Sequence, residues 1–187
     1  MLLLASKSPR RRELIKMLDI PFRTVELKDI EEIYSSDLPK EKVPEFLSRL
    51  KAEAYFSELK EGDILITADT VVLLDDEIIG KPGDAEEAKE MLSKLSGKIH
   101  RVVTGVTITS TKKSVTFSSI TEVTFSSLTS DEIEYYVSTY NPLDKAGAYG
   151  IQEWIGAVGI SGIRGSYYNV MGLPVNRLYK ELLLFDR

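Results

Sequence analysis

Short, uninterrupted apolar runs alternate along the chain with segments in which apolar residues recur every three or four positions. Residues 2–5 form an apolar run that is typical of a buried strand. After this run, Leu14, Ile15 and Leu18 share one helical face, and Pro9 suits the first turn of that helix. The same patterns predict strands at residues 22–25, 63–67, 71–74, 77–79, 100–111 and 114–127, a glycine-rich strand pair before residue 173, and helices at 9–18, 42–59, 84–95, 129–138 and 173–184. Because strands and helices are interspersed, the chain is predicted to form an α/β fold with a mixed sheet.

Length and composition are those of a globular protein. The chain has 187 residues, of which 43% are hydrophobic and 28% are charged. This length can bury a core and suits one domain over residues 1–187 or two small lobes. The absence of cysteine excludes disulfides, thiol nucleophiles and cysteine-ligated zinc.

The charge balance and the opening residues narrow the expected partners. A net charge of −5 and a pI of about 5.1 argue against a general affinity for nucleic acid. The first apolar run is too short for a signal peptide, and no stretch approaches the length of a membrane span. We therefore expect a cytoplasmic protein that binds neither nucleic acid nor membranes.

A basic segment joins the first predicted strand to the first helix. It contains Ser6, Ser8 and the three arginines 10–12. Free N–H groups and the helix dipole make such a position favourable for anions. Arg11 continues the apolar stripe of the helix, so its side chain is predicted to point inward, where it needs a partner. A bound polyphosphate and a solvated basic cap paired with Glu13 both fit the pattern.

Asp69 and Thr70 follow the predicted strand at residues 63–67. Open α/β sheets bind ligands at the carboxyl ends of strands, so Asp69 could hold a hard cation, orient a water molecule, or do both. A turn-capping aspartate is the structural alternative.

Three further candidates are weaker when taken singly. Glu32, in the acidic loop after the second strand, could be a metal ligand, although a solvated loop explains it equally well. Lys81, at the end of a hairpin, could contact phosphate, and Lys51 could do the same if its helix face borders the site. Both lysines could equally be surface residues.

The segment at residues 144–152 combines small residues with polar side chains. Its glycines and alanines would let the backbone approach a ligand, while Lys145, Tyr149 and Gln152 would present polar ends. A glutamine amide offers a donor and an acceptor side by side, as uracil and thymine edges require. Packing at a helix terminus is the alternative. His100, the only histidine, and Trp154 are expected to be structural.

In this order along nearly the whole chain, these segments resemble one family, Maf. Ile33-Tyr34 departs from the Thr-Pro often found after the glutamate of the acidic loop. The resemblance rests on Ser6-x-Ser8-Pro9-Arg10-Arg11, Glu32, Lys51-Ala52, Ala68-Asp69-Thr70-Val71-Val72, Gly80-Lys81-Pro82, Val103-Thr104-Gly105-Val106, residues 144–152, and Asn169-Val170-x-Gly172-Leu173-Pro174.

The resemblance implies a mixed, twisted sheet in an elongated, two-lobed α/β domain with a deep central cleft, the fold of inosine triphosphate pyrophosphatases. It implies Asp69 as the proton acceptor of a hydrolytic reaction and, with Glu32, as a ligand of a divalent cation (Mg²⁺, Mn²⁺ or Co²⁺). The residues that it implies for phosphate binding are Ser6, Ser8, Arg10, Arg11, Lys51 and Lys81.

Residues 144–152 are similar to the subgroup that hydrolyses dTTP and UTP to the monophosphate and pyrophosphate. In that subgroup the residues that match Arg11, Thr70 and Gln152 set substrate choice. Two other functions remain open: a nucleotide-binding regulator of cell division without important turnover, and a purine-directed pyrophosphatase on a related fold. A homodimer is expected from the resemblance, although no sequence feature requires it.

Overall fold

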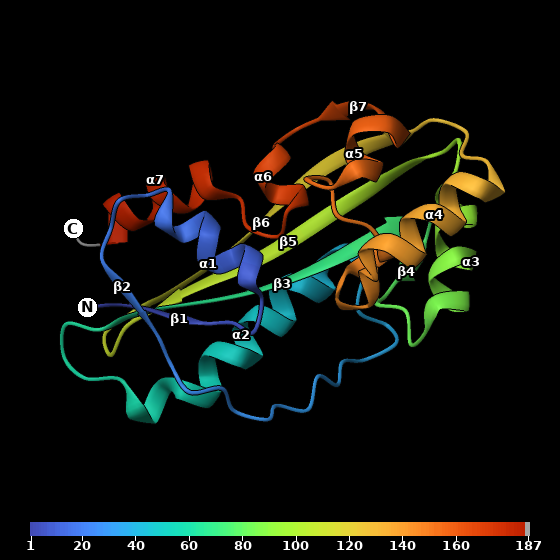
Figure 1. The fold of residues 1–187 in the computed structure, drawn as a ribbon. Coiled ribbons are helices and arrows are strands. Elements are labelled where there is room, and N and C mark those ends of the chain that lie inside the picture. Colours follow the sequence, from blue (N-terminus) through green and yellow to red (C-terminus); the bar gives the residue numbers. More distant parts are fainter. Residues whose placement is uncertain (186–187) are drawn as a thin grey trace. The chain divides into compact units, whose positions relative to one another are not determined.

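The computed structural model describes residues 1–185 and contains a seven-stranded mixed sheet (Figure 1). The strand order is β2-β1-β3-β5-β6-β7, and β4 pairs with β3. Strands β1 and β2 run parallel to each other, β1 is also parallel to β3, and the β3–β4 and β6–β7 pairs are antiparallel. The elements are β1 (Leu2–Ala5), α1 (Pro9–Lys16), β2 (Phe22–Thr24), η1 (Lys40–Lys42), α2 (Val43–Tyr55), η2 (Phe56–Glu58), β3 (Ile64–Leu74), β4 (Glu77–Ile79), α3 (Ala85–Leu95), β5 (Ile99–Thr109), β6 (Ser114–Phe125), α4 (Ser130–Tyr140), η3 (Pro142–Asp144), η4 (Ala146–Ala148), α5 (Trp154–Gly159), β7 (Ile160–Arg164), α6 (Tyr167–Val170) and α7 (Val175–Phe185).

The predicted α/β class with a mixed sheet is confirmed, and two elements differ from the prediction. The segments predicted as separate strands at residues 63–67 and 71–74 form one continuous strand, β3, through Asp69 and Thr70. The predicted glycine-rich strand pair is a short helix, α5, followed by the single strand β7. A Cβ at Gly156 would lie 1.8 Å from the Ile151 carbonyl oxygen, so this glycine permits a tight helical turn that its strand-like spacing did not indicate.

Contacts divide the described chain into two compact units. Unit 1 comprises Met1–Thr70, Thr104–Ser119 and the chain from Gly172 onward, and unit 2 comprises Val71–Val103 and Ile120–Met171. The prediction of one domain over residues 1–187, of which 186 and 187 lie outside the described part, remains a prediction.

Unit 2 has a core that joins α3 and α4 to the strands. The two helices lie against each other (Figure 1). Helix α4 begins with a capping box, in which Thr129 and Glu132 bond each other's backbone N–H groups. The fully buried Tyr136 side chain from α4 lies in this core with residues of α3, β5 and β6. Burial of these apolar side chains stabilises unit 2.

In unit 1, α2 lies close to strand β5 because Gly105 has no side chain. A Cβ at Gly105 would lie 2.2 Å from the carbonyl carbon and oxygen of Pro44, in the first turn of α2. Backbone atoms cannot yield at that distance. Gly105 therefore fixes how closely α2 approaches the sheet within unit 1.

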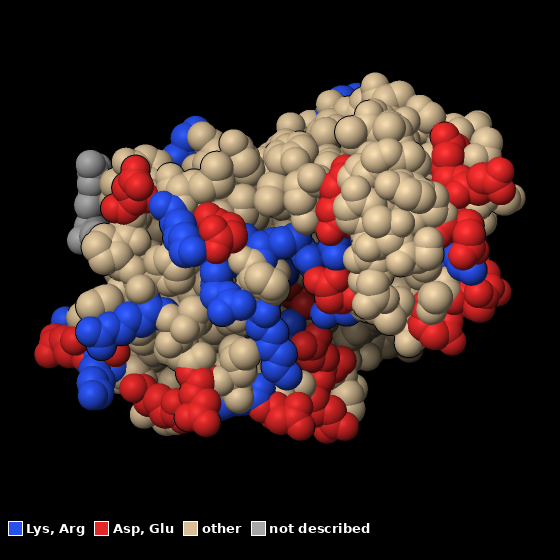
Figure 2. All heavy atoms as spheres, in the orientation of Figure 1, with Lys and Arg blue, Asp and Glu red and all other residues tan. Residues whose placement is uncertain are grey.

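Within residues 1–185, no helix combines the length and the apolar character that crossing a membrane requires. On the face drawn in Figure 2, basic and acidic side chains are interspersed among neutral ones. This distribution agrees with the modest net charge of −5.

The Gly105→Ala substitution is expected to lower the free energy of unfolding by about 1–3 kcal/mol, the range for forced overpacking. Gly80→Ala is the matched control, because a Cβ at Gly80 would meet no atom within 4 Å. Chemical denaturation of both variants measures the difference. Equal, small effects would show that α2 does not depend on contact with Gly105.

Candidate functional site

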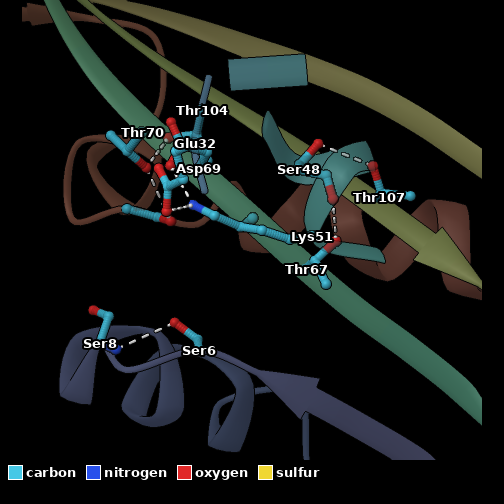
Figure 3. A network of polar contacts seen from close by, with 12 residues as sticks. Ser6, Ser8, Glu32, Ser48, Lys51, Thr67, Asp69, Thr70, Thr104 and Thr107 are labelled. Atoms are coloured by element: carbon cyan, nitrogen blue, oxygen red, sulfur yellow. Dashed lines mark hydrogen bonds and ion pairs between the residues drawn. The ribbon is translucent and has the colours of Figure 1, made fainter. Parts of the chain in front are cut away.

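Two carboxylates of unit 1 converge on the ammonium group of Lys51 (Figure 3). The Lys51 Nζ atom lies 2.7 Å from Asp69 Oδ1 and 3.0 Å from Glu32 Oε1. The Lys51 and Asp69 side chains are 18% and 14% exposed, whereas Glu32 is 48% exposed. Lys51 therefore offsets the repulsion between the two carboxylates, and the three predicted site residues Glu32, Lys51 and Asp69 lie together.

Asp69 lies in the middle of β3 and not at a strand end, which corrects the sequence-based placement. Strand β1 pairs with β3 only as far as Thr67, and β4 pairs with β3 only from Val72 onward. Asp69 and Thr70 thus lie between two pairings of one continuous strand. The sequence suggested an end because the apolar run stops at Thr67, while β3 itself continues.

Lys51 is positioned by hydrogen bonds around Ser48, which lies one turn earlier in α2. The Ser48 hydroxyl donates to the Glu45 carbonyl and shares a hydrogen bond of 2.9 Å with Thr107 Oγ1. Thr67 Oγ1 donates to the Ser48 carbonyl at 2.6 Å. Ser48 and Thr67 are fully buried, and Figure 3 shows this group beside Lys51. These hydrogen bonds attach α2 to β3 and β5 one helical turn before Lys51.

The loop that carries Glu32 is attached to the end of α2. The Lys28 backbone N–H donates to the Tyr55 hydroxyl at 2.9 Å, and the Lys28 ammonium lies 2.6 Å from Glu58. Ile30 and Val25 pack on the cluster around Tyr55. The loop is therefore ordered by the helix that also bears Lys51.

Ser6 and Ser8 lie in the turn between β1 and α1. The Ser6 hydroxyl accepts from the Ser8 N–H at 3.2 Å, and the Ser8 hydroxyl caps α1 by accepting from the Arg11 N–H at 3.4 Å. The first turn of α1 contains no acidic residue. Because Ala5 pairs with Thr67, this turn follows β1 where β3 continues to Asp69. The turn that carries Ser6 and Ser8 thus begins beside the residues of β3 that precede Asp69.

Arg11 points inward, as its helical position predicts, and its partners are groups of the protein. Its Nε donates to the Gly172 carbonyl at 2.8 Å, Nη1 to the Ala68 carbonyl at 2.9 Å, and Nη2 to Thr70 Oγ1 at 2.9 Å. Burial lowers the pKa of Arg11, and the nearby Asp69 opposes that effect. The Arg11 side chain stays charged at neutral pH. Through its three hydrogen bonds, it links α1 to β3 and to the turn at Gly172.

Thr70 joins Arg11 to β5. Its hydroxyl accepts from Arg11 and shares a hydrogen bond of 2.9 Å with the hydroxyl of the buried Thr104. Thr104 lies in the Val103-Thr104-Gly105-Val106 motif but was not predicted as a site residue. The contact between Thr104 and Thr70 could not be predicted from the sequence, because 34 residues separate the two threonines.

The two remaining predicted residues, Lys81 and Gln152, belong to unit 2 and have exposed side chains. Lys81 follows β4, and the neighbouring Gly80 carbonyl accepts from the Gly147 N–H at 2.9 Å. Gly147 has a φ of +70°, and a Cβ there would lie 3.0 Å from Val72. The 144–152 segment is therefore packed closely against its own unit, as the packing alternative predicted.

Lys145 and Tyr149 do not present free polar ends, contrary to the prediction. The Lys145 residue is 7% exposed, and its ammonium binds Asp144 at 2.7 Å and Glu153 at 3.2 Å. The Tyr149 hydroxyl forms a hydrogen bond of 2.7 Å with His100 Nε2. Both side chains hold the segment to the core, and only Gln152 of the three is exposed.

His100 is structural, as predicted. It is 1% exposed and packs edge-on against Phe125 and Tyr149. Burial lowers the pKa of His100 to about 4, so the ring is neutral at physiological pH. It contributes a fixed support for Tyr149.

The arrangement in unit 1 can bind an anion and activate a water molecule. Ser6, Ser8 and the start of α1 provide hydrogen-bond donors, and Arg10 and Lys51 provide positive charge. Asp69 provides a fixed, partly exposed carboxylate. A carboxylate beside a bound phosphate is the arrangement that hydrolytic phosphoryl chemistry needs.

Comparison with known proteins places these residues in a family. A family model described as "Maf-like protein" matches residues 1–185. The chain is 51% identical over 181 residues to a dTTP/UTP pyrophosphatase of Phocaeicola vulgatus, covering 97% of this chain and 94% of that protein. It is 53% identical over 183 residues to one of Porphyromonas gingivalis, covering 97% and 92%.

The fold is similar to that of the Staphylococcus aureus Ham1 protein. The TM-score is 0.57 at 19% identity, and the match covers 100% of this chain and 99% of the other. At that identity, the similarity confirms the fold alone.

The Arg11→Lys substitution is expected to lower the free energy of unfolding by roughly 2–4 kcal/mol, because a lysine cannot replace three forked hydrogen bonds. Arg12→Lys is the control, since the Arg12 side chain is exposed. This substitution should change the free energy of unfolding by no more than about 0.5 kcal/mol. Urea denaturation compares the two. Equal small losses would favour a solvated basic cap over a buried link.

Proposed function

The chain belongs to the Maf family, and on that premise we propose that it is a nucleoside triphosphate pyrophosphatase that converts dTTP and UTP to the monophosphate and pyrophosphate. Relatives that are 51% and 53% identical over nearly the whole chain carry the name dTTP/UTP pyrophosphatase. The observation that carries the proposal is the Asp69–Lys51–Glu32 group of unit 1, on the strand that pairs with β1 just before the turn of Ser6 and Ser8.

The proposed reaction is attack of water on the α-phosphorus, with pyrophosphate as the leaving group. Asp69 orients the water and accepts its proton at a carboxylate oxygen. Lys51, held 2.7 Å from Asp69, places positive charge beside the reacting phosphate. Ser6, Ser8, Arg10 and Lys81 bind phosphate oxygens, and Arg11 keeps Ala68 and Thr70 in place on either side of Asp69.

The residues present fit a divalent cation. The Asp69 and Glu32 carboxylates converge on one positive charge, the Lys51 ammonium, so the local charge already suits a cation. Within residues 1–185, no group of three or more His, Cys, Asp or Glu side chains is arranged around a metal position. Mg²⁺ commonly uses one or two carboxylates together with substrate phosphates and water. A bound Mg²⁺, Mn²⁺ or Co²⁺ would neutralise phosphate charge and acidify the attacking water.

Substrate choice is assigned to Arg11, Thr70 and Gln152. The exposed Gln152 amide can pair with a uracil or thymine edge. This assignment favours pyrimidine triphosphates over the purine-directed alternative. A nucleotide-binding regulator without turnover would have little need of the fixed carboxylate at Asp69.

The cellular setting follows from the substrate. Nucleoside triphosphates are cytoplasmic metabolites, so we expect the protein to act in the cytoplasm, with a nucleotide as its partner and neither nucleic acid nor a membrane. The absence of cysteine agrees with a reducing compartment. A homodimer remains a prediction.

The Asp69→Asn substitution is expected to lower the rate of pyrophosphate release from UTP by about 10²- to 10⁴-fold, the usual effect of removing a general base. Asp37→Asn is the control, because it removes an exposed carboxylate from the loop that carries Glu32. Pyrophosphate and orthophosphate are assayed separately with Mg²⁺ or Mn²⁺. Orthophosphate as the product, or an unchanged rate in Asp69→Asn, would overturn the proposed function, and full activity in EDTA would overturn the metal requirement.

A further inference from the structure

A single hydroxyl group binds the chain on both sides of Gln152. Tyr136, fully buried in α4, donates its hydroxyl proton to the Glu153 carboxylate, and the same oxygen accepts from the Gly150 N–H at 2.9 Å. The Glu153 N–H donates to the Gly150 carbonyl at 3.0 Å and closes a turn. Gln152 is therefore held within a four-residue turn whose two ends both bond one side chain of the core.

The Gln152 side chain rests on the same turn. A Cβ at Gly150 would lie 3.1 Å from Gln152 Nε2 and 2.8 Å from the carboxylate carbon of Glu153. Across residues 1–185, the structure shows no hydrogen bond to the Gln152 amide itself. The position of the Gln152 side chain therefore depends on the backbone of the turn and on packing over Gly150.

Charge reinforces the turn. The buried Lys145 ammonium lies 3.2 Å from the Glu153 carboxylate, so Glu153 forms an ion pair with Lys145 and accepts a hydrogen bond from Tyr136. A buried lysine requires such a partner. Burial and the neighbouring Glu153 both raise the pKa of Tyr136, so its hydroxyl keeps the proton that it donates. Glu153 thus has a fixed place and anchors the residue next to Gln152.

We propose that Tyr136 and Glu153 are positioning residues for base selection, an inference that rests on the proposed function. Uracil and thymine present acceptor, donor and acceptor along the pairing edge, whereas cytosine reverses part of that order. A freely moving amide can rotate to suit either base. The Tyr136–Glu153 link restricts the turn, so that Gln152 meets the uracil or thymine edge and leaves unpaired groups against cytosine.

The test is the ratio of kcat/KM for UTP to that for CTP in Tyr136→Phe, which keeps the buried ring and removes only the hydroxyl. The preference for UTP is expected to fall by about threefold to tenfold, mainly through a higher KM for UTP, with kcat within about twofold. Tyr140→Phe is the matched control on the same helix, because Tyr140 stacks on Tyr136 with ring centres 5.1 Å apart. It should keep the wild-type ratio.

Glu153 supplies a second, independent comparison. Glu153→Gln retains an acceptor for Tyr136 and should keep more of the UTP preference than Glu153→Ala. An unchanged ratio in both Tyr136→Phe and Glu153→Ala, in folded protein, would overturn the positioning role alone. A wild-type protein that does not hydrolyse UTP, or that hydrolyses CTP equally well, would instead overturn the proposed function or the role of Gln152 in it.

Discussion

The ion pair between Lys51 and the carboxylates of Asp69 and Glu32 is the constraint around which unit 1 is arranged. A cation that lies between two carboxylates offsets their mutual repulsion. Lys51 comes from α2, Asp69 from β3 and Glu32 from an irregular loop, so three parts of the chain must be placed independently. Gly105, Ser48 and Thr67 place the helix, and Lys28 with Tyr55 places the loop.

Arg11 makes the corresponding contribution on the other side of Asp69. Its guanidinium bonds the carbonyl before Asp69 and the hydroxyl after it, so the carboxylate lies between two fixed points of β3. This strand segment lies between its pairings with β1 and β4. Arg11, which its position in the sequence suggests as a ligand-binding residue, therefore also holds parts of the fold together. In the proposed function, the two roles are compatible because Arg11 uses three of its five N–H groups in the protein.

The helices and the direction of some side chains could be predicted from the sequence, because local patterns of residues determine them. The helix that begins at Pro9 follows from the proline in its first turn and from its apolar spacing, and the inward direction of Arg11 follows from the same spacing. The continuity of β3 through Asp69 could not be predicted, since the apolar run is broken there. The pairing of Tyr136 with Glu153 also had no signal, because Tyr136 occupies an ordinary core position of α4 and its hydroxyl partner lies 17 residues away.

In the proposed reaction, water positioned by Asp69 attacks the α-phosphorus of a pyrimidine nucleoside triphosphate. Hydrolysis of UTP in ¹⁸O-labelled water, followed by mass spectrometry of both products, shows which phosphorus is attacked. Attack at the α-phosphorus places one labelled oxygen in the monophosphate and none in the pyrophosphate. Label in the pyrophosphate would show attack at the β-phosphorus, and it would contradict the role assigned to Asp69 and to the charged group around Lys51.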